Sequence, residues 1–288
     1  MSPEAERMKH PRRVSDAIVV DEIGIEYGRY GDLILKSAYQ KIFRREEEWL
    51  RPFAAEGLVV PFRDGQPLPP EALFDATPDE DKVFVESMCR TLHLRNYDNI
   101  GEPGLVLFFN FDPRTNSDFA VMVKELEFIA GRYGEIQLDS HLLVCEIVET
   151  EAQDLDTLSR IAGEMRRHGI RLALDDFGVG ASNLERVKLL TPDIIKIDGG
   201  WFRQIATVPA AAGLFKSFVT GLHGLGTKVL IEGIETSEQL ACAIDADADY
   251  LQGFLFSRPK LAGTIFEAAA LRIDTLLEPH ANVVKLFK

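Results

Sequence analysis

Five short apolar runs, each ending in carboxylate or amide side chains, constrain the fold of this chain more than any other feature of its sequence. The runs lie at residues 105–110 (LVLFFN), 142–149 (LLVCEIVE), 171–176 (RLALDD), 194–198 (IIKID) and 228–235 (KVLIEGIE). A short, continuous apolar run between helical stretches is typical of a strand that is buried on both faces. Such strands form parallel α/β sheets and barrels, whose functional groups gather beyond the carboxyl ends of the strands.

The length of the chain suits one large domain built in this way. It has 288 residues, and a (β/α)8 barrel typically takes about 250. Helical stretches between the apolar runs are long enough for the crossovers that parallel strands need. Before the first run, residues 33–43 and 50–60 indicate two strands joined by a polar turn, which predicts a hairpin. We expect an N-terminal arm at 1–30, one domain at 31–270 and a tail at 271–288, with helices that include 84–97, 118–133 and 264–277.

Composition and charge narrow the functional classes. The hydrophobic content of 46% supports a sizeable core, and the net charge is −14. That charge argues against binding to nucleic acid polymer, which needs a cationic face, but leaves a small phosphorylated ligand open, since bound metal reverses the local field. There is no membrane-spanning stretch and no secretory signal. Cys89, Cys145 and Cys242 are widely spaced, as reduced core thiols are. We therefore expect a cytoplasmic protein.

Oxygen-bearing side chains recur at the predicted strand ends, where carboxylates repel one another unless a cation binds among them. The adjacent pair Asp175-Asp176 can share one cation and hold a second, although an N-cap pair for the next helix is an alternative. Oxygen-only ligands suit Mg²⁺ or Mn²⁺, and no histidines are spaced for zinc. The candidates are Glu56, Asn110, Glu146, Glu149, Asp175, Asp176, Lys196, Glu232, Glu235 and Gln252.

Other motifs carry less weight. The FGVGASN loop after Asp176 contains GxGxxN, which is not a dinucleotide-binding fingerprint, because the acids precede it. There is no GxSxG elbow and no Cys/His pair for covalent catalysis. Lys196 lies in an apolar strand, where burial is costly unless acids face it. Beside acids, it becomes a candidate for a functional role.

Five motifs in this order, LVCEIVET, LALDDFGVGASNL, IIKID, LIEGIET and YLQGFLFSRP, resemble those of the EAL-domain cyclic-di-GMP phosphodiesterases. The resemblance runs from about residue 35 to residue 266, and the name-giving motif corresponds to Glu56-Gly57-Leu58. It implies a modified TIM (β/α)8 barrel with one antiparallel strand near the start, so that 31–270 would be the EAL phosphodiesterase domain. It also implies a homodimer that hydrolyses cyclic-di-GMP to linear pGpG and so lowers a bacterial second messenger.

The resemblance also implies a role for each matching residue, with two Mg²⁺ or Mn²⁺ ions at the barrel mouth. The first ion would be held by Glu56, Asn110, Glu146 and Asp175, and the second by Asp175, Asp176 and Glu232. Lys196 would position the attacking water or help to deprotonate it, acting with Glu232, and Glu149 would brace the loop after Asp176 near a dimer interface. The substrate-binding residues would be Gln40, Lys41 and Gln252, with Gln252 orienting the Glu232 side or the ligand.

Some positions depart from the family pattern. Val60 stands where the family usually has an arginine that clamps a substrate phosphate, and nearby Lys41, in place of a proline, would compensate in part. Gly199 and Gly200 replace a longer polar pair, and Asn110 lies in FFNFDP rather than VNLS. The departures leave two alternatives to the enzyme open. One is an impaired EAL domain that serves as a cyclic-di-GMP receptor or protein-interaction module, and the other is hydrolysis of a different phosphodiester.

Overall fold

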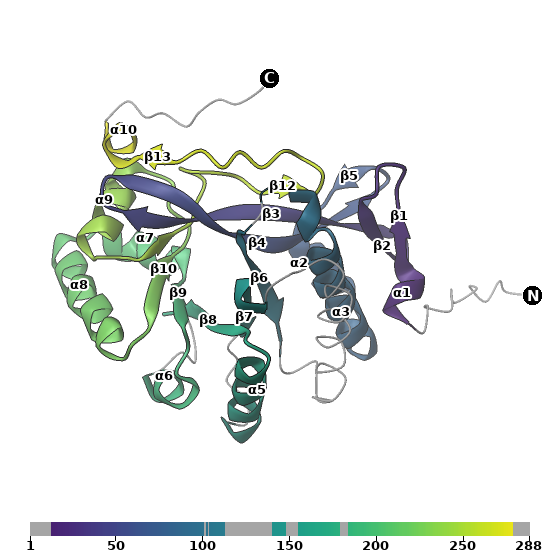
Figure 1. Cartoon of the computed structure of the whole chain (residues 1–288), viewed down its shortest axis with the longest axis horizontal. Coiled ribbons are helices and arrows are strands. Elements are labelled where there is room, and N and C mark those ends of the chain that lie inside the picture. The colour runs from purple at the N-terminus through teal and green to yellow at the C-terminus, as the bar shows by residue number, and fades with distance from the viewer. Residues whose placement is uncertain are drawn as a thin grey trace, which may run out of the picture.

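A long antiparallel hairpin, β3 (Leu33–Glu46) with β4 (Trp49–Arg63), runs across the upper part of the molecule in Figure 1. The computed structural model describes residues 13–100, 102, 104–112, 140–147, 155–178 and 184–278. The hairpin confirms the two predicted strands and is longer than expected. The predicted helix at 118–133 and the candidate Glu149 lie outside the described residues.

Eight strands, which include both strands of this hairpin, close into a barrel. Going round the wall from β3, neighbouring strands pair in the order β3-β11-β10-β9-β8-β7-β6-β4, and the β3–β4 pairing joins the two ends. Within this wall, each strand from β4 round through β6 to β11 is parallel to the next. Strand β3 is antiparallel to both of its wall neighbours, β4 and β11. This confirms the modified TIM barrel. The remaining strands are β6 (Val106–Phe111), β7 (Leu143–Ile147), β8 (Arg171–Phe177), β9 (Ile194–Ile197), β10 (Lys228–Ile231) and β11 (Tyr250–Leu251).

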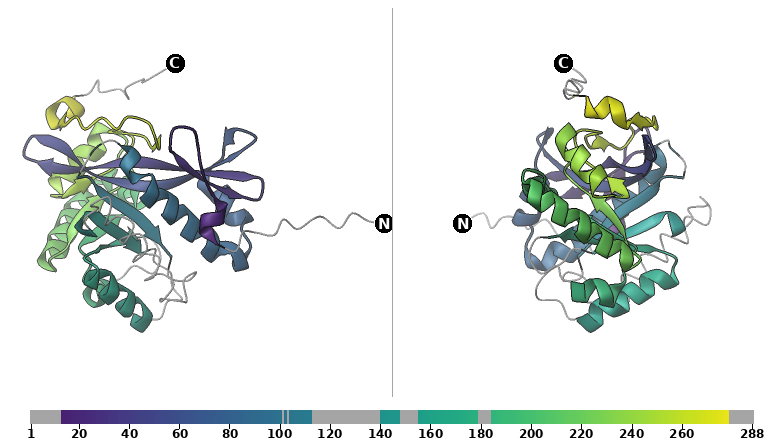
Figure 2. Two further views of the ribbon diagram at one scale, coloured as in Figure 1. Left: turned by 45° about the vertical axis from the view of Figure 1, so that its right-hand side comes forward. Right: turned by 90° about the vertical axis from the view of Figure 1, so that its left-hand side faces the viewer.

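Helices cover the outside of the barrel wall, as the two turned views in Figure 2 show. Their apolar faces and the outward side chains of the strands form the largest buried cluster, which includes Leu107, Phe109 and Leu172. Helix α3 packs on β3, β4 and the outer strand β2 (Glu26–Tyr30), while α5 packs on β8 and α8 on β10. The helices are α2 (Pro70–Ala76), α3 (Asp79–Arg95), α5 (Leu155–Arg167), α6 (Leu184–Leu190), α7 (Gly199–Ala206), α8 (Pro209–Gly224) and α9 (Ser237–Asp245), with 3-10 turns η1 (Tyr97–Ile100) and η2 (Ser140–Leu142).

Short elements near both ends of the chain extend the hairpin rather than the barrel. In the segment expected to be an arm, α1 (Val14–Ala17) precedes β1 (Ile18–Val20) and β2 (Glu26–Tyr30), and β2 pairs with β3. The expected helix at 264–277 is wrong over most of its length, because β13 (Leu271–Arg272) pairs with β4 and only α10 (Ile273–Leu277) is helical. The short strands β5 (Gln66–Pro67) and β12 (Lys260–Leu261) also join the hairpin. The domain boundaries at 30 and 270 stay predictions.

The barrel interior is filled by a layer of apolar side chains from all eight strands. Because side chains alternate along a strand, the residues of this layer face inward while their neighbours face the helices. The interior layer consists of Ile42, Ala54, Val106, Phe108, Val144, Ala173, Ile194, Leu230 and Tyr250.

Among the described residues, no helix has both the length and the apolar character that crossing a bilayer requires.

Candidate active site at the barrel mouth

Each barrel strand contributes one polar residue two positions beyond the apolar interior layer. Ala54 is followed in this way by Glu56, and Ala173 by Asp175. On the antiparallel strand β3 the order is reversed, so that Gln40 precedes Ile42. Since residues i and i+2 share a face of a strand, the eight polar residues meet in one ring at the carboxyl ends of the parallel strands. The ring consists of Gln40, Glu56, Asn110, Glu146, Asp175, Lys196, Glu232 and Gln252.

Lys196 lies at the centre of this ring. Its Nζ is 2.5 Å from Glu146, 2.7 Å from Glu232, 3.0 Å from Asp175 and 3.3 Å from Glu56, measured to one carboxylate oxygen of each. Only 1% of the Lys196 side chain is exposed. The predicted condition for burying this lysine, that acids face it, is therefore met by four acids from four strands.

When its four acids are ionised, the cluster has more negative charge than Lys196 can neutralise. One ammonium carries one charge and three protons, whereas four ionised carboxylates would carry four charges and many more lone pairs. Glu146 is fully buried, and its Oε2 has no hydrogen-bond partner among the described residues. Buried carboxylates of this kind are costly unless cations reach them. The oxygen-rich donor set and the orphaned Glu146 oxygen thus fit a site for hard divalent cations.

Two glutamines complete the ring on the side away from this cluster. Gln252 Nε2 donates to Glu56 Oε2 at 2.6 Å and lies 3.3 Å from Gln40 Oε1. Gln40 in turn donates from Nε2 to the Ser257 carbonyl at 3.1 Å. Glu56 therefore has one oxygen facing Lys196 and the other fixed by a neutral amide.

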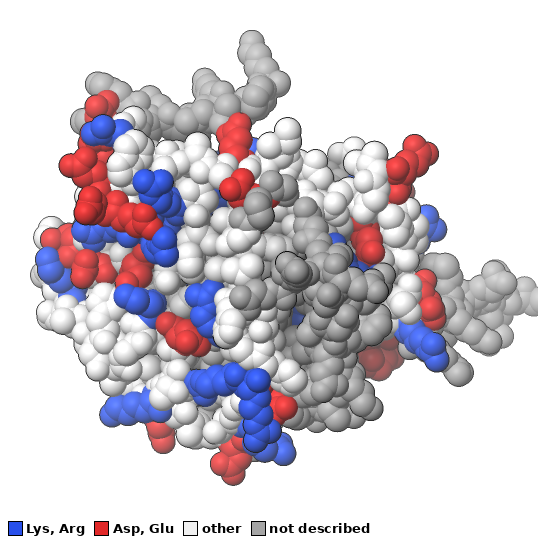
Figure 3. Space-filling view, viewed as in Figure 1, with Lys and Arg blue, Asp and Glu red and all other residues white. Residues whose placement is uncertain are grey.

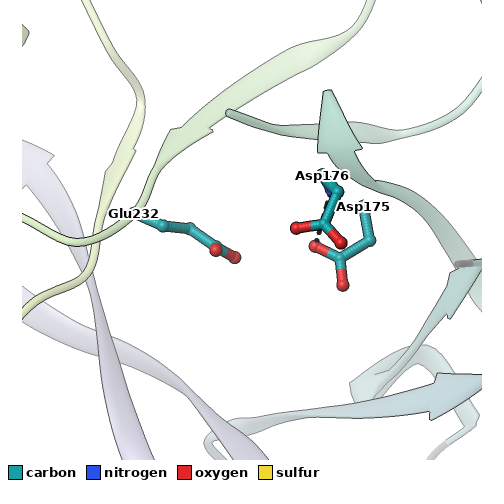
Figure 4. Close-up of side chains that lie close together, drawn as sticks. All are labelled: Asp175, Asp176 and Glu232. Atoms are coloured by element: carbon teal, nitrogen blue, oxygen red, sulfur yellow. Dashed lines mark hydrogen bonds between the residues drawn. The ribbon is translucent and has the colours of Figure 1, made fainter. Parts of the chain in front are cut away.

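Asp176 reaches the mouth because β8 is irregular at its end. The β8–β9 register shifts between Leu174 and Phe177, and Asp176 has a positive φ of 52°. One carboxylate oxygen each of Asp175, Asp176 and Glu232 lies within 4.8 Å of the others, and Figure 4 shows these side chains pointing toward one another. Because both aspartates belong to β8, the alternative that they form an N-cap pair is wrong.

The electrostatics follow from burial and crowding. Burial raises the pKa of Glu146 well above its ordinary value, against the pull of Lys196. Burial likewise raises the pKa of Glu232 to about 8, and loss of hydration with the charge of Asp175 raises the pKa of Asp176 to about 6. Burial alone would lower the pKa of Lys196, but the surrounding carboxylates, Asp175 foremost, raise it well above its ordinary value. Lys196 is therefore an ammonium at neutral pH.

The cluster lies between two cavities. The first, of about 910 Å³, is bordered by Asn110, Asp175 and Asp176 and extends to α2 and α3. The second, of about 230 Å³, is lined by Gln40, Glu56, Glu232 and Gln252, together with Phe254 and other residues. A ligand with two arms therefore has room on both sides of the carboxylates. On the outer face in Figure 3, by contrast, acidic and basic side chains are interspersed.

Several predicted site residues are not in the cluster. Lys41 follows Gln40 on β3 and so faces the opposite side, where its Nζ bonds the Glu267 carbonyl and lies 4.9 Å from the Phe266 ring centre. Its predicted contact with a substrate phosphate has no support in this geometry. Glu235 lines the second cavity but lies 3.8 Å from Arg203 rather than at Lys196.

Two residues at the cavities were not among the candidates. Arg203 lines the second cavity and donates to the Gly233 carbonyl at 3.3 Å, directly after Glu232. His93 lines the first cavity from α3 and is 5% exposed. Neither lies at the end of an apolar run, so strand patterning gave no signal for them. Only the Gly57 of the name-giving motif hinted at close packing.

The model of the EAL domain family matches residues 63–259 of this chain. That range covers more than half of the chain, so the protein belongs to the EAL-domain family. The match begins at the last residue of β4, after Glu56. The contacts with Lys196 and Gln252 thus place Glu56 in the ring independently of the family match.

Relatives of known sequence agree with this assignment. The chain is 28% identical over 240 residues to the probable cyclic di-GMP phosphodiesterase PdeA of Escherichia coli, which covers 80% of the chain and 31% of PdeA. It is 31% identical over 185 residues to the cyclic di-GMP phosphodiesterase RocR of Pseudomonas aeruginosa, with 62% of the chain and 45% of RocR covered. The chain thus spans less than half of either relative.

Solved structures are similar over most of the chain. Klebsiella pneumoniae BlrP1, solved with manganese and cyclic di-GMP, superposes with a TM-score of 0.71 at 26% identity, covering 83% of this chain and 59% of BlrP1. Bacillus subtilis YkuI, with an EAL domain, cyclic di-GMP and calcium, gives a TM-score of 0.69 at 26% identity, covering 81% of this chain and 57% of YkuI.

Proposed function

We propose that this chain hydrolyses one phosphodiester of cyclic-di-GMP to give linear pGpG. The observation that carries the proposal is the enclosed cluster of four carboxylates around Lys196, which lies between two cavities. A cyclic dinucleotide has two nucleotide arms joined by two phosphodiesters, and it matches a charged centre with room on either side. The solved relatives that bind cyclic di-GMP with manganese or calcium support the same reading.

The donor set fits two divalent ions, Mg²⁺ or Mn²⁺. Glu56, Asn110, Glu146 and Asp175 would hold one, and Asp175, Asp176 and Glu232 the other. Two such ions lower the pKa of a bound water and neutralise charge on a phosphodiester during in-line displacement. The chain supplies the ligands from rigid strand ends, which keeps their spacing fixed.

The remaining residues of the ring position these groups. The close contacts of Lys196 Nζ with four carboxylates favour holding an oxygen by donation over removing a proton from water, so of its two implied roles we propose positioning. Gln252 fixes one oxygen of Glu56 and leaves the other facing Lys196. Gln40 anchors Gln252 and borders the second cavity, where it can also meet the ligand.

The test is incubation of purified protein with cyclic-di-GMP and Mg²⁺ or Mn²⁺, following pGpG by chromatography. We expect turnover that Ca²⁺ inhibits, since Ca²⁺ is larger and less strict in geometry. Glu56→Ala and Asp175→Asn should each lower turnover by about a hundredfold or more, because each removes stabilisation worth several kcal/mol. Full turnover by either variant would contradict the two-ion assignment.

A receptor is the second candidate, favoured by one observation. Val60, on β4 and paired with Lys36, gives an apolar side chain where the resemblance leads one to expect an arginine. A lost charge-assisted contact costs about 1.5–3 kcal/mol of affinity. Binding of cyclic-di-GMP without turnover, with turnover appearing in Val60→Arg, would establish the receptor. Efficient turnover by the wild type would remove it.

We also propose that the protein is a homodimer, as the resemblance implies. Light scattering over a range of concentrations measures this directly. A monomer mass at every concentration would contradict the dimer while leaving the proposed hydrolysis intact.

A further inference from the structure

Gly57, next to Glu56 in the name-giving motif, lies where His93 of helix α3 packs closely against the barrel wall. Glu56 faces the ring inside the barrel, so Gly57 faces outward, toward His93 of α3. An ideal Cβ at Gly57 would lie 2.9 Å from both Cβ and Cγ of His93 and 3.2 Å from its Cδ2. Apart from atoms of its own and adjacent residues, a Cβ essentially never has a heavy atom within 3.0 Å. The glycine is thus required by the histidine.

His93 is fixed from the hairpin side as well. Its Nδ1 is 2.9 Å from the Ser37 hydroxyl, and its carbonyl accepts a hydrogen bond from the Tyr39 hydroxyl at 2.6 Å. The Tyr39 ring meets the imidazole edge-on, with 6.5 Å between ring centres. Ser37 and Tyr39 both belong to β3, so His93 binds one strand of the hairpin and packs on the other.

These contacts lie directly behind the functional ring. In the β3–β4 register, Tyr39 is opposite Gly57 and Gln40 is opposite Glu56. The pair Tyr39 and Gly57 faces outward and packs against His93. The next pair, Gln40 and Glu56, faces inward and carries the amide and the carboxylate of the ring. Any displacement of the wall at His93 therefore moves Gln40 and Glu56 together.

We propose that His93 is a positioning residue that holds Glu56 in register with its ligand partners through Gly57. The inference rests on the proposed cation site but not on the identity of the substrate. Gly57, the glycine of this chain's variant of the motif, and His93 on α3 are then complementary in shape. In this arrangement, the packing outside the barrel wall sets cation affinity inside it.

The test measures Mn²⁺ affinity by calorimetry, well below the unfolding temperature of each variant. Gly57→Ala should weaken Mn²⁺ binding by about tenfold, the lower end of the cost of disturbing residues that support a metal ligand. In a His93→Ala background the same change should cost clearly less, because the ring contacts and the Ser37 bond are gone and only the Cβ contact remains. His93→Asn, which keeps a hydrogen-bonding group near Nδ1, should stay closer to wild type than His93→Ala.

Two matched controls separate positioning from general destabilisation. A Cβ at Gly28 would also press on α3, 2.8 Å from Met88 Sδ, but Gly28 pairs with Leu35, which is opposite Pro61 rather than Glu56 on β4. Met88, fully buried on the same helix, packs in a separate core cluster with Leu35 and Val59 of the hairpin. Gly28→Ala and Met88→Ala should lower stability and leave Mn²⁺ affinity within about twofold, as expected for sites that do not couple.

The outcomes separate this inference from the proposed function. Wild-type protein that fails to bind Mn²⁺ would overturn both. Wild-type binding with unchanged affinity in Gly57→Ala and His93→Ala would overturn the positioning role alone. Equal losses from Gly57→Ala with and without His93 would do the same. If Gly57→Ala does not fold, the comparison of His93→Ala with Met88→Ala still decides the question.

Discussion

The two halves of the barrel mouth hold Glu56 by opposite means. In the carboxylate half, formed by Glu146, Asp175, Lys196 and Glu232, acids outnumber the cation that faces them. In the amide half, formed by Gln40 and Gln252, neutral amide groups donate to Glu56 Oε2, to Gln40 Oε1 and to the Ser257 carbonyl. One half is built from unbalanced charge and the other from hydrogen bonds of neutral amides.

The difference shows where chemistry and position are separated in this fold. Unbalanced carboxylates attract cations, but they repel one another and so oppose the close spacing that the strand ends impose. The amides and the close packing carry no net charge, so they hold geometry without such repulsion. Glu56 belongs to both halves, which explains why it is supported from the inside by Gln252 and from the outside, through Gly57, by His93.

Replacing the central cation should break the carboxylate half most severely. Lys196→Met removes the cation that faces Glu232 and the buried acids Glu56, Glu146 and Asp175, so the metal-free protein should lose about 3–5 kcal/mol of unfolding free energy. Urea denaturation in the presence of a chelator measures this. Lys216→Met, at an exposed lysine paired with Asp245, is the matched control and should change stability by no more than about 0.5 kcal/mol. Equal urea midpoints for Lys196→Met and Lys216→Met would show that Lys196 does not offset the negative charge of the carboxylates.

A methyl group at Gly178 should disturb the carboxylate half from behind. Gly178 follows the end of β8 with a φ of 107°, and a Cβ there would overlap the ring of Trp201. Gly226 has a similar φ of 85° but nothing within 4 Å of its Cβ position. Gly226→Ala should cost about 1 kcal/mol through backbone strain, and Gly178→Ala about 2 kcal/mol more through overlap with the ring. Equal losses of unfolding free energy in Gly178→Ala and Gly226→Ala would mean that the Trp201 ring moves aside without measurable cost.

His93, which packs behind the amide half, should affect the pH dependence of stability. Burial, with the charge of Arg90, lowers the pKa of His93 to about 3. The unfolded chain takes up a proton near pH 6.5 and the folded one only near pH 3, so His93 makes stability fall as the pH falls through this window. The slope is at most about 1.4 kcal/mol per pH unit. His93→Asn should flatten the curve between pH 6 and 4, and an unchanged slope would show that other groups dominate.

Lys41 lies outside both halves and should matter least. Its side chain bonds the Glu267 carbonyl and packs on Phe266, and burial lowers its pKa. Lys41→Met should cost about 1–2 kcal/mol of stability through these lost contacts. Turnover and Mn²⁺ affinity should stay within about twofold of wild type, because no ring residue changes. A larger loss of turnover would return Lys41 to the substrate-binding residues.

The sequence pattern predicted which residues lie on the inward face of the barrel, but it did not predict the contacts on the outward face. The apolar runs end in Asn110, Glu146, Asp175, Lys196 and Glu232 because one strand period separates the interior layer from the ring. The same period of two, applied to Gln40 and Lys41, already assigns them to opposite faces. The contact of Gly57 with His93 joins residues far apart in the chain through the angle at which α3 packs, and no local pattern encodes that angle. The helix expected at 264–277 failed because pairing with the hairpin outweighed helical periodicity.

The seam of the barrel has a consequence for the timing of folding. The wall closes where β3 meets β11, with Phe43 opposite Leu251. During synthesis the hairpin leaves the ribosome early, whereas its partner follows only after nearly all other strands have been made. Until then, one edge of β3 and each newly added strand lack a neighbour, and such edges invite pairing with other chains. Contacts between segments so far apart in the chain form slowly, and the edge of β3 that pairs with β11 cannot be covered by it before residue 251 has emerged.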